Sequence, residues 1–285
     1  MLLVACLPPD FNLTHIDDLQ VVAVQVDPPA LAPGLDVVVT TWVADPARRG
    51  ADILLYTCTI IDEEGCVEGR EVQGTGPHPL TAWSAVGQLV GNNWSVGFSL
   101  PTDDEQFLAD LDIPGSSETL LYALACEPGA CEIIDRVAAD PPPGTEAYQN
   151  ILDMFANPEP WVAELPRDVS SLAIKTVTLQ QSESVSNTNP RVTPLSPGAV
   201  LAYRDDLDPI DLTFNVFDGG QANFDVRAYT TVGTIYGIDP KPTSVDFTWN
   251  PGTMVGEGEI FLVVADKNGG IGVKAKRVSV RPNEP

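Results

Sequence analysis

The residues of this chain that could support covalent chemistry are its five cysteines, all in the first half of the sequence. Cys58 and Cys66 flank one turn, and Cys126 and Cys131 flank another. Four cysteines allow three pairings, and the short spacings favour Cys58 with Cys66 and Cys126 with Cys131. Cys58 with Cys126 is the main rival, because the strands that they end could be neighbours. Disulfides in either arrangement indicate an oxidising compartment.

Zinc binding by these four thiolates is a weaker interpretation, because the spacings are not those of a zinc knuckle and no histidine assists. The two histidines are His15, in a polar N-terminal segment, and His78, in a proline-rich loop, and both are expected at the surface. A serine or cysteine nucleophile needs a neighbouring base. Paired carboxylates, which glycosidases use, do not indicate an enzyme here, because in so acidic a chain such pairs commonly arise by chance. The sequence therefore predicts no enzyme and no cofactor.

One acidic loop suggests a cation site. It runs from Arg204 to Asp211 and contains four aspartates. Together with Asp266 and Asn268 it could offer the six to eight oxygen ligands that calcium takes. No complete ligand pattern can be assembled, so a hydrated acidic turn is the alternative and no metal ligand is assigned.

The composition excludes several function classes. The 285 residues include 40 acidic and 15 basic ones, a net charge of −25 that disfavours contact with nucleic acid or anionic lipid. Residues 1–150 hold 23 of the acids and only four arginines. The 26 prolines and 23 glycines suit an all-β protein rich in turns, and no apolar run is long enough to span a membrane as a helix.

The pattern of the first 180 residues predicts a sandwich that begins near residue 19. Val22, Val24 and Val26 alternate with Ala23, Gln25 and Asp27, and a proline-rich break then leads to a second strand at 37–43. Such a break lets the first strand leave one sheet for the other, as an immunoglobulin-like sandwich requires. The break contains 31–34 (Leu-Ala-Pro-Gly), which matches 195–198 (Leu-Ser-Pro-Gly). Asp45 after the next strand matches Asp218, and 173–179 resembles 273–280.

These weak repeats predict two related domains, at 19–181 and 182–285. Within the first, 53–60 and 120–126 read as buried apolar strands, and short helical patterns occur near 103–111 and at 145–155. The second helix lies in an insertion at about 128–168. Because loops often carry function, this insertion is the preferred partner site. The alternative is a helix that merely caps the open end of the sandwich.

The last strands carry the clearest resemblance. Val245, Phe247 and Trp249 alternate with polar residues, 259–265 is an apolar strand, and Asn268-Gly269-Gly270 predicts a hairpin turn. This sequence pattern resembles that of bacterial immunoglobulin-like domains of the PKD and cadherin-like kind. The resemblance implies an all-β chain of two immunoglobulin-like β-sandwich domains in tandem, the first with a partly helical insertion.

The N-terminal residues Leu3-Val4-Ala5-Cys6 resemble the lipobox of bacterial lipoproteins. The resemblance implies a lipid on Cys6, followed by a tether to about Asp18, and Leu7 rather than aspartate after the cysteine implies the outer membrane. A basic n-region and a full apolar region are missing, so either the true start lies upstream or the match is accidental. The alternative is an ordinary buried cysteine.

The predicted function is that of a non-catalytic surface or periplasmic lipoprotein with a structural or protein-interaction role. Its partner would be a protein or glycan of the cell envelope, with membrane contact only through the lipid. A carbohydrate-binding or adhesive module is the alternative, and it requires Trp83, Trp94 or Trp161 to line an exposed groove.

Overall fold

The computed structural model describes eleven stretches of the chain, with gaps between them. These are residues 15–32, 35–62, 65–66, 84–99, 116–142, 144–156, 159–180, 187–196, 198–204, 208–217 and 224–282. Cys6, His78, Trp83 and the helical pattern at 103–111 lie outside them. The predicted domain boundary near 182 also falls in a gap, so it stays a prediction.

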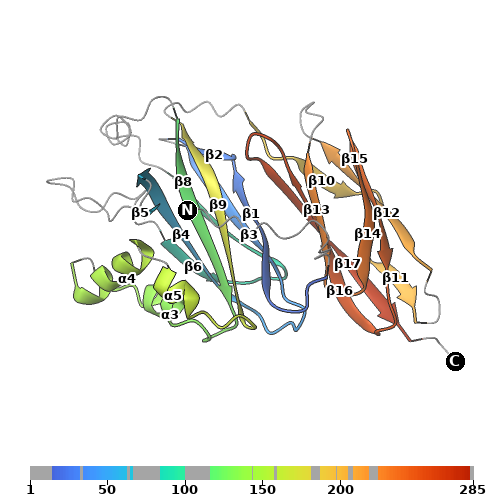
Figure 1. The fold of residues 1–285 in the computed structure, drawn as a ribbon, viewed down its shortest axis with the longest axis horizontal. Coiled ribbons are helices and arrows are strands. Elements are labelled where there is room, and N and C mark those ends of the chain that lie inside the picture. The colour runs from blue at the N-terminus through green and yellow to red at the C-terminus, as the bar shows by residue number, and fades with distance from the viewer. Residues whose placement is uncertain are drawn as a thin grey trace.

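The first sandwich consists of two facing sheets (Figure 1). One sheet has the order β1-β3-β7, with β1 at Gln20–Asp27, β3 at Asp36–Ala44 and β7 at Asn93–Ser99. The other has the order β2-β9-β8-β4-β5, and β6 also pairs with β4. Its strands are β2 (Ala30–Leu31), β4 (Asp52–Asp62), β5 (Gly65–Cys66), β6 (Ser84–Gln88), β8 (Ser116–Cys126) and β9 (Ser170–Gln180).

The predicted change of sheet by the first strand is confirmed. β1 pairs antiparallel with β3, and after Pro28 and Pro29 the chain continues as β2, which pairs in parallel with β9 of the opposite sheet. Proline has no N–H to donate to a strand ladder, so two prolines suit the point where the chain leaves one sheet.

The second sandwich repeats this arrangement. One sheet has the order β10-β12-β15-β14, and the other has the order β11-β17-β16-β13. The strands are β10 (Arg191–Pro194), β11 (Val200–Tyr203), β12 (Ile210–Phe217), β13 (Asp225–Thr230), β14 (Thr234–Lys241), β15 (Ser244–Asn250), β16 (Gly256–Ala265) and β17 (Ile271–Arg281). Here too the first strand is split, because β11 pairs in parallel with the last strand, β17. This is the immunoglobulin order, so the chain is an all-β tandem of two immunoglobulin-like sandwiches.

One repeated sequence lies at a different point in each sandwich. The segment 195–198 joins the two halves of the split strand, between β10 and β11, whereas 31–34 lies between β2 and β3. The counterpart of 195–198 is therefore Pro28-Pro29. The match of 173–179 with 273–280 falls on equivalent elements, because β9 and β17 both close a sandwich. Asp218, the predicted counterpart of Asp45, lies outside the described residues.

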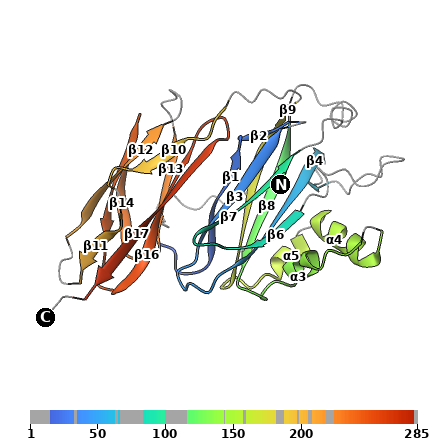
Figure 2. The same ribbon diagram turned by 180° about the vertical axis from the view of Figure 1, so that it is seen from behind.

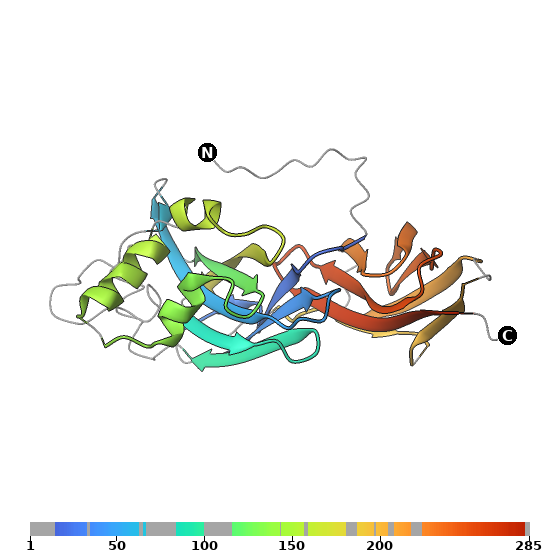
Figure 3. The same ribbon diagram turned by 90° about the horizontal axis from the view of Figure 1, so that it is seen from below.

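Three helices cover the outer face of the larger sheet in the first sandwich (Figures 2 and 3). They are α3 (Glu132–Ala138), α4 (Glu146–Ala156) and α5 (Glu159–Ala163). The helix predicted at 145–155 is thus confirmed as α4, and the Thr145 hydroxyl caps it by accepting a hydrogen bond from Tyr148 N–H. Because β4 and β8 are covered on both faces, their sequences are apolar at consecutive positions rather than at alternate ones.

An aromatic stack joins the helices to the sheet. Tyr56 of β4 lies between Tyr122 of β8 and Phe155 of α4, at ring-centroid distances of 4.6 and 4.3 Å. Trp161 of α5 packs at the side of this stack, and its indole N–H donates to Met154 O at 2.7 Å. The predicted insertion therefore covers the outer face of this sheet rather than capping the open end of the sandwich.

We expect Tyr56→Phe to stabilise the protein. The Tyr56 ring is fully buried, and its hydroxyl has no hydrogen-bond partner among the residues that the structure describes. A buried unsatisfied hydroxyl costs about 1–3 kcal/mol, so its removal should raise the free energy of unfolding by roughly 1 kcal/mol. Urea denaturation of Tyr56→Phe against Tyr203→Phe, whose ring is 43% exposed, checks this. A lower stability for Tyr56→Phe would contradict it.

Candidate functional site

The two sandwiches pack side by side through the outer faces of their sheets (Figure 1). The β1 and β3 strands of the first sandwich contact β13, β16 and β17 of the second. We call these contacts the seam, and its residues are Ile16, Val22, Ala23, Trp42, Ala44, Tyr229, Phe261, Val263, Ile271, Val273 and Ala275. Phe261 lies at its centre with no solvent exposure. The chain is therefore layered as helices, two sheets, the seam and two further sheets.

The sequence of β16 and β1 explains why the seam forms. In β16, Ile260, Leu262 and Val264 point into the core of the second sandwich, while Phe261 and Val263 point outward to the seam. An apolar residue at every position is the pattern of a strand buried on both faces. In β1 a register shift between Val21 and Ala23 places apolar side chains on both faces as well.

Polar contacts close the seam at the end near the β16–β17 turn. The Asn189 side chain donates to Val26 O at 2.8 Å and accepts from Ile271 N–H at 2.9 Å, which ties the two sandwiches together. The Lys175 ammonium of β9 donates to Gly269 O at 2.9 Å. Burial lowers the pKa of Lys175 to about 8, and the nearby Asp266 carboxylate offsets part of this effect.

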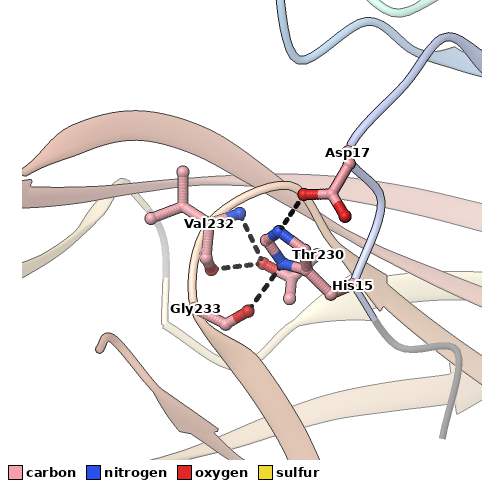
Figure 4. A network of polar contacts seen from close by, with 5 residues as sticks. All are labelled: His15, Asp17, Thr230, Val232 and Gly233. Atoms are coloured by element: carbon pink, nitrogen blue, oxygen red, sulfur yellow. Dashed lines mark hydrogen bonds and ion pairs between the residues drawn. The ribbon is translucent and has the colours of Figure 1, made fainter. Parts of the chain in front are cut away.

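The N-terminal segment is fixed beside the seam (Figure 4). Ile16 is 3% exposed and its N–H donates to Thr230 O at 2.8 Å, while the His15 ring bonds Gly233 O and Asp17. Thr230 is itself fixed, because its hydroxyl donates to Val232 O. The predicted tether runs to residue 18, but the structure docks His15 and Ile16 of this segment on the second sandwich. A pull on the N-terminus would therefore act on both sandwiches.

A crevice of about 610 Å³ opens at the opposite end of the seam. Asp45, Arg48 and Leu89 line it from the first sandwich. From the second come Glu257 and Glu259 of β16, Leu201 of β11, and Arg277, Ser279 and Arg281 of β17. This junction is the candidate functional site, because both sandwiches build it and the seam fixes its walls.

From the sequence, no residue of this crevice was assigned a binding role, and Asp45 entered only as a match between the two repeats. The sequence did contain one indication of the crevice. Side chains alternate between the two faces of a strand, so Glu257 and Glu259 of β16 must lie on the same face as Phe261 and Val263. What the sequence did not reveal is that the first sandwich covers only part of that face.

The cysteine predictions have different outcomes. A disulfide joins Cys126 and Cys131, with Cα atoms 6.1 Å apart, and it links the end of β8 to the start of α3. The rival Cys58–Cys126 pairing is wrong. Although β4 and β8 are neighbours, their register sets Cys58 opposite Leu120 and Cys126 opposite Asp52, about 20 Å apart along the strands. The Cys58–Cys66 pairing stays a prediction, on adjacent antiparallel strands.

The described residues that were considered for calcium do not gather, and Asp205 and Asp206 lie outside the described stretches. Arg204 N–H donates to Arg281 O, so the acidic loop starts at the far end of β17. Asp266 lies before the start of β17, about 33 Å away along the strand. Its carboxylate accepts hydrogen bonds from Asn268 N–H, Gly270 N–H and the Asn187 side chain, which stabilise the predicted hairpin turn. Within the described stretches, no three acidic, histidine or cysteine side chains are placed to share a metal ion.

The tryptophans considered for carbohydrate binding are mostly packed. Trp161 is 9% exposed, and Trp94 packs against the core of the first sandwich. Trp83 lies outside the described residues. No helix in the described part of the chain is long and apolar enough to span a membrane.

Comparisons with known proteins add little to this fold assignment. No protein-family model and no curated protein matches the chain. Among solved structures, Dpr2 Ig1-Ig2 in complex with DIP-Theta matches with 6% identity, 94% of this chain and 96% of that chain covered, and a TM-score of 0.29. Tandem Ig repeats of Dlar match with 8% identity, 94% of this chain and 97% of that chain covered, and a TM-score of 0.28. The SrpA adhesin from Streptococcus sanguinis matches with 14% identity, 35% of this chain and 61% of that chain covered, and a TM-score of 0.25. At these scores the fold assignment rests on strand order alone.

Lys175 should make the stability of the protein depend on pH. Its pKa is about 8 in the folded protein and near 10.5 when unfolded, so between these values the unfolded chain binds a proton that the folded chain does not. Stability should therefore rise with pH across this window. We expect the free energy of unfolding of wild type, relative to Lys175→Met, to increase by about 1–3 kcal/mol from pH 7.5 to 10.5.

Urea denaturation at both pH values measures this difference. Arg48→Met is the matched control, because its ion pair with Glu257 is exposed. A constant difference between wild type and Lys175→Met would show that Lys175 is not buried at the seam.

Proposed function

We propose that this chain is a non-catalytic interaction module of a bacterial cell envelope, held at the membrane through a lipid on Cys6. Its two sandwiches act as one rigid body that presents the crevice to a protein partner. The observation that carries the proposal is the seam, because burial of β16 and β17 on both faces fixes residues of both sandwiches around one concave surface.

The N-terminal geometry supports the tethering part of the proposal. The segment that follows Cys6 docks at Thr230 and Gly233, beside the seam, so the anchor holds both sandwiches rather than the first alone. A lipoprotein carries several acyl chains, which bind a membrane far more strongly than the marginal affinity of a single chain.

The binding of a protein partner is supported by the kinds of residues at the crevice. Arginine and tyrosine are enriched at the energetic centres of interfaces. Arg277 and Arg281 line the crevice, and Tyr203 of β11 is in register with Arg281 at its border. The carbohydrate alternative loses the support of Trp94 and Trp161, since both contribute to packing.

The experiment uses the full chain, expressed in native cells from an upstream start, with a photoreactive residue in place of Leu201. We expect the protein to partition into detergent, to lose this partitioning in Cys6→Ser, and to form a discrete cross-linked species in the membrane fraction. The matched control places the photoreactive residue at Val38, which is 45% exposed against 46% for Leu201.

Two results would refute separate parts of the proposal. Equal partitioning of wild type and Cys6→Ser would exclude the lipid anchor. Equal cross-linking from Val38 and Leu201, or none from either, would exclude the crevice as the interaction surface.

A further inference from the structure

The crevice contains three acidic side chains, and each already has a partner. The Asp45 carboxylate accepts a hydrogen bond from Gly50 N–H at 2.8 Å. Both terminal nitrogens of Arg48 donate to Glu257 at 3.1 Å. The third acid, Glu259, accepts from the side chain of Asn92 at 3.3 Å. Arg48 thus neutralises Glu257, whereas Asp45 and Glu259 accept hydrogen bonds from neutral groups and keep their negative charge.

The two arginines of β17 that line the crevice have no such partner. Within the described part of the chain, neither the Arg277 nor the Arg281 side chain forms a hydrogen bond or ion pair, and both are exposed. They are four residues apart on one face of a strand, hence about 13 Å apart. In a chain with a net charge of −25, two exposed guanidinium groups on one wall of a crevice are a local site for carboxylates, although Glu259 lies opposite Arg277 in the β16–β17 pair.

Two exposed apolar side chains of the neighbouring strand β11 lie beside these arginines. Leu201 and Tyr203 of β11 are 46% and 43% exposed. The parallel register places Leu201 beside Ser279 and Tyr203 beside Arg281, so all four side chains share a face of the sheet. Exposed leucine and tyrosine beside arginine provide apolar contact area together with charge.

We propose that the crevice binds an extended peptide segment of a partner protein, with two carboxylates about four residues apart and apolar side chains between them. The spacing follows from that of Arg277 and Arg281, because an extended peptide advances by the same distance per residue as β17. The apolar side chains would pack on Leu201 and Tyr203. The inference rests on the proposed interaction function, and it names the chemistry of the partner.

The overall charge favours a short acidic segment over a long polyanion. At physiological salt, charges more than about 8 Å away are largely screened, so two carboxylates at the crevice respond mainly to the nearby arginines. A long polyanion extends past the crevice along a chain with 40 acidic residues, which repels it.

The test selects peptides from a random displayed library on the purified protein, which assumes no partner sequence. We expect enriched peptides to carry two acidic residues three to five positions apart with apolar residues between them. Their affinity should fall about tenfold or more for the Arg277→Ala/Arg281→Ala double variant. The matched control is Arg191→Ala/Arg227→Ala, which removes two exposed arginines elsewhere on the second sandwich and should bind as wild type does.

Three outcomes would overturn the inference. These are selection of no peptide, selection of peptides without acidic residues, and equal binding to the two double variants. A thermal unfolding midpoint like that of wild type in both variants shows that lost binding is not lost folding. These results concern purified protein and peptides, so failure here leaves cross-linking from Leu201 and lipid attachment at Cys6 as separate measurements of the proposed function.

Discussion

The burial of Phe261 and its neighbours between two sheets is the interaction on which the rest of the structure depends. A β-sheet of a sandwich usually buries one face, but the sheet formed by β11, β17, β16 and β13 buries one face and much of the other. This double burial fixes the position of the second sandwich relative to the first. The docked N-terminal segment and the crevice both follow from that fixed position.

The apolar part of the seam should contribute more to its stability than the polar contacts around it. Full burial of a phenylalanine side chain stabilises by about 1.5–3 kcal/mol. By contrast, both partners of the Arg48–Glu257 ion pair are about two-thirds exposed, and such pairs contribute about 0–1 kcal/mol. Lys175 has a lowered pKa, so its charge opposes folding near neutral pH. The polar contacts therefore set the register of the two sandwiches, and the apolar seam stabilises their association.

The repeated strands and the proline break were predictable from the sequence because they depend on local chemistry. Alternation at Val245, Phe247 and Trp249 specifies a strand with one buried face, and all three side chains are buried. The role of the helical insertion was harder to predict, since an amphipathic helix such as α4 can cover its own sheet or present a surface to a partner. Phe155 and Trp161 show that the helices cover their own sheet, because both pack on Tyr56. A partner site on the insertion stays a prediction.

The crevice could not be predicted because it depends on contacts between distant parts of the sequence. Arg48 and Glu257 are 209 residues apart, and nothing local to either specifies that they meet. The described residues considered for calcium lie apart for a related reason. Clustering in the sequence indicated one group of carboxylates, but the length of β17 separates Asp266 from the acidic loop.

The most direct measurement of the seam is the effect of Phe261→Asp on domain coupling. Phe261 contributes to the seam and not to the core of the second sandwich, so each sandwich should stay folded. We predict that thermal unfolding changes from one transition to two and that the hydrodynamic radius increases, whereas Leu201→Asp, on the uncovered part of the same sheet, behaves as wild type does. A single transition and an unchanged radius for Phe261→Asp would contradict the account.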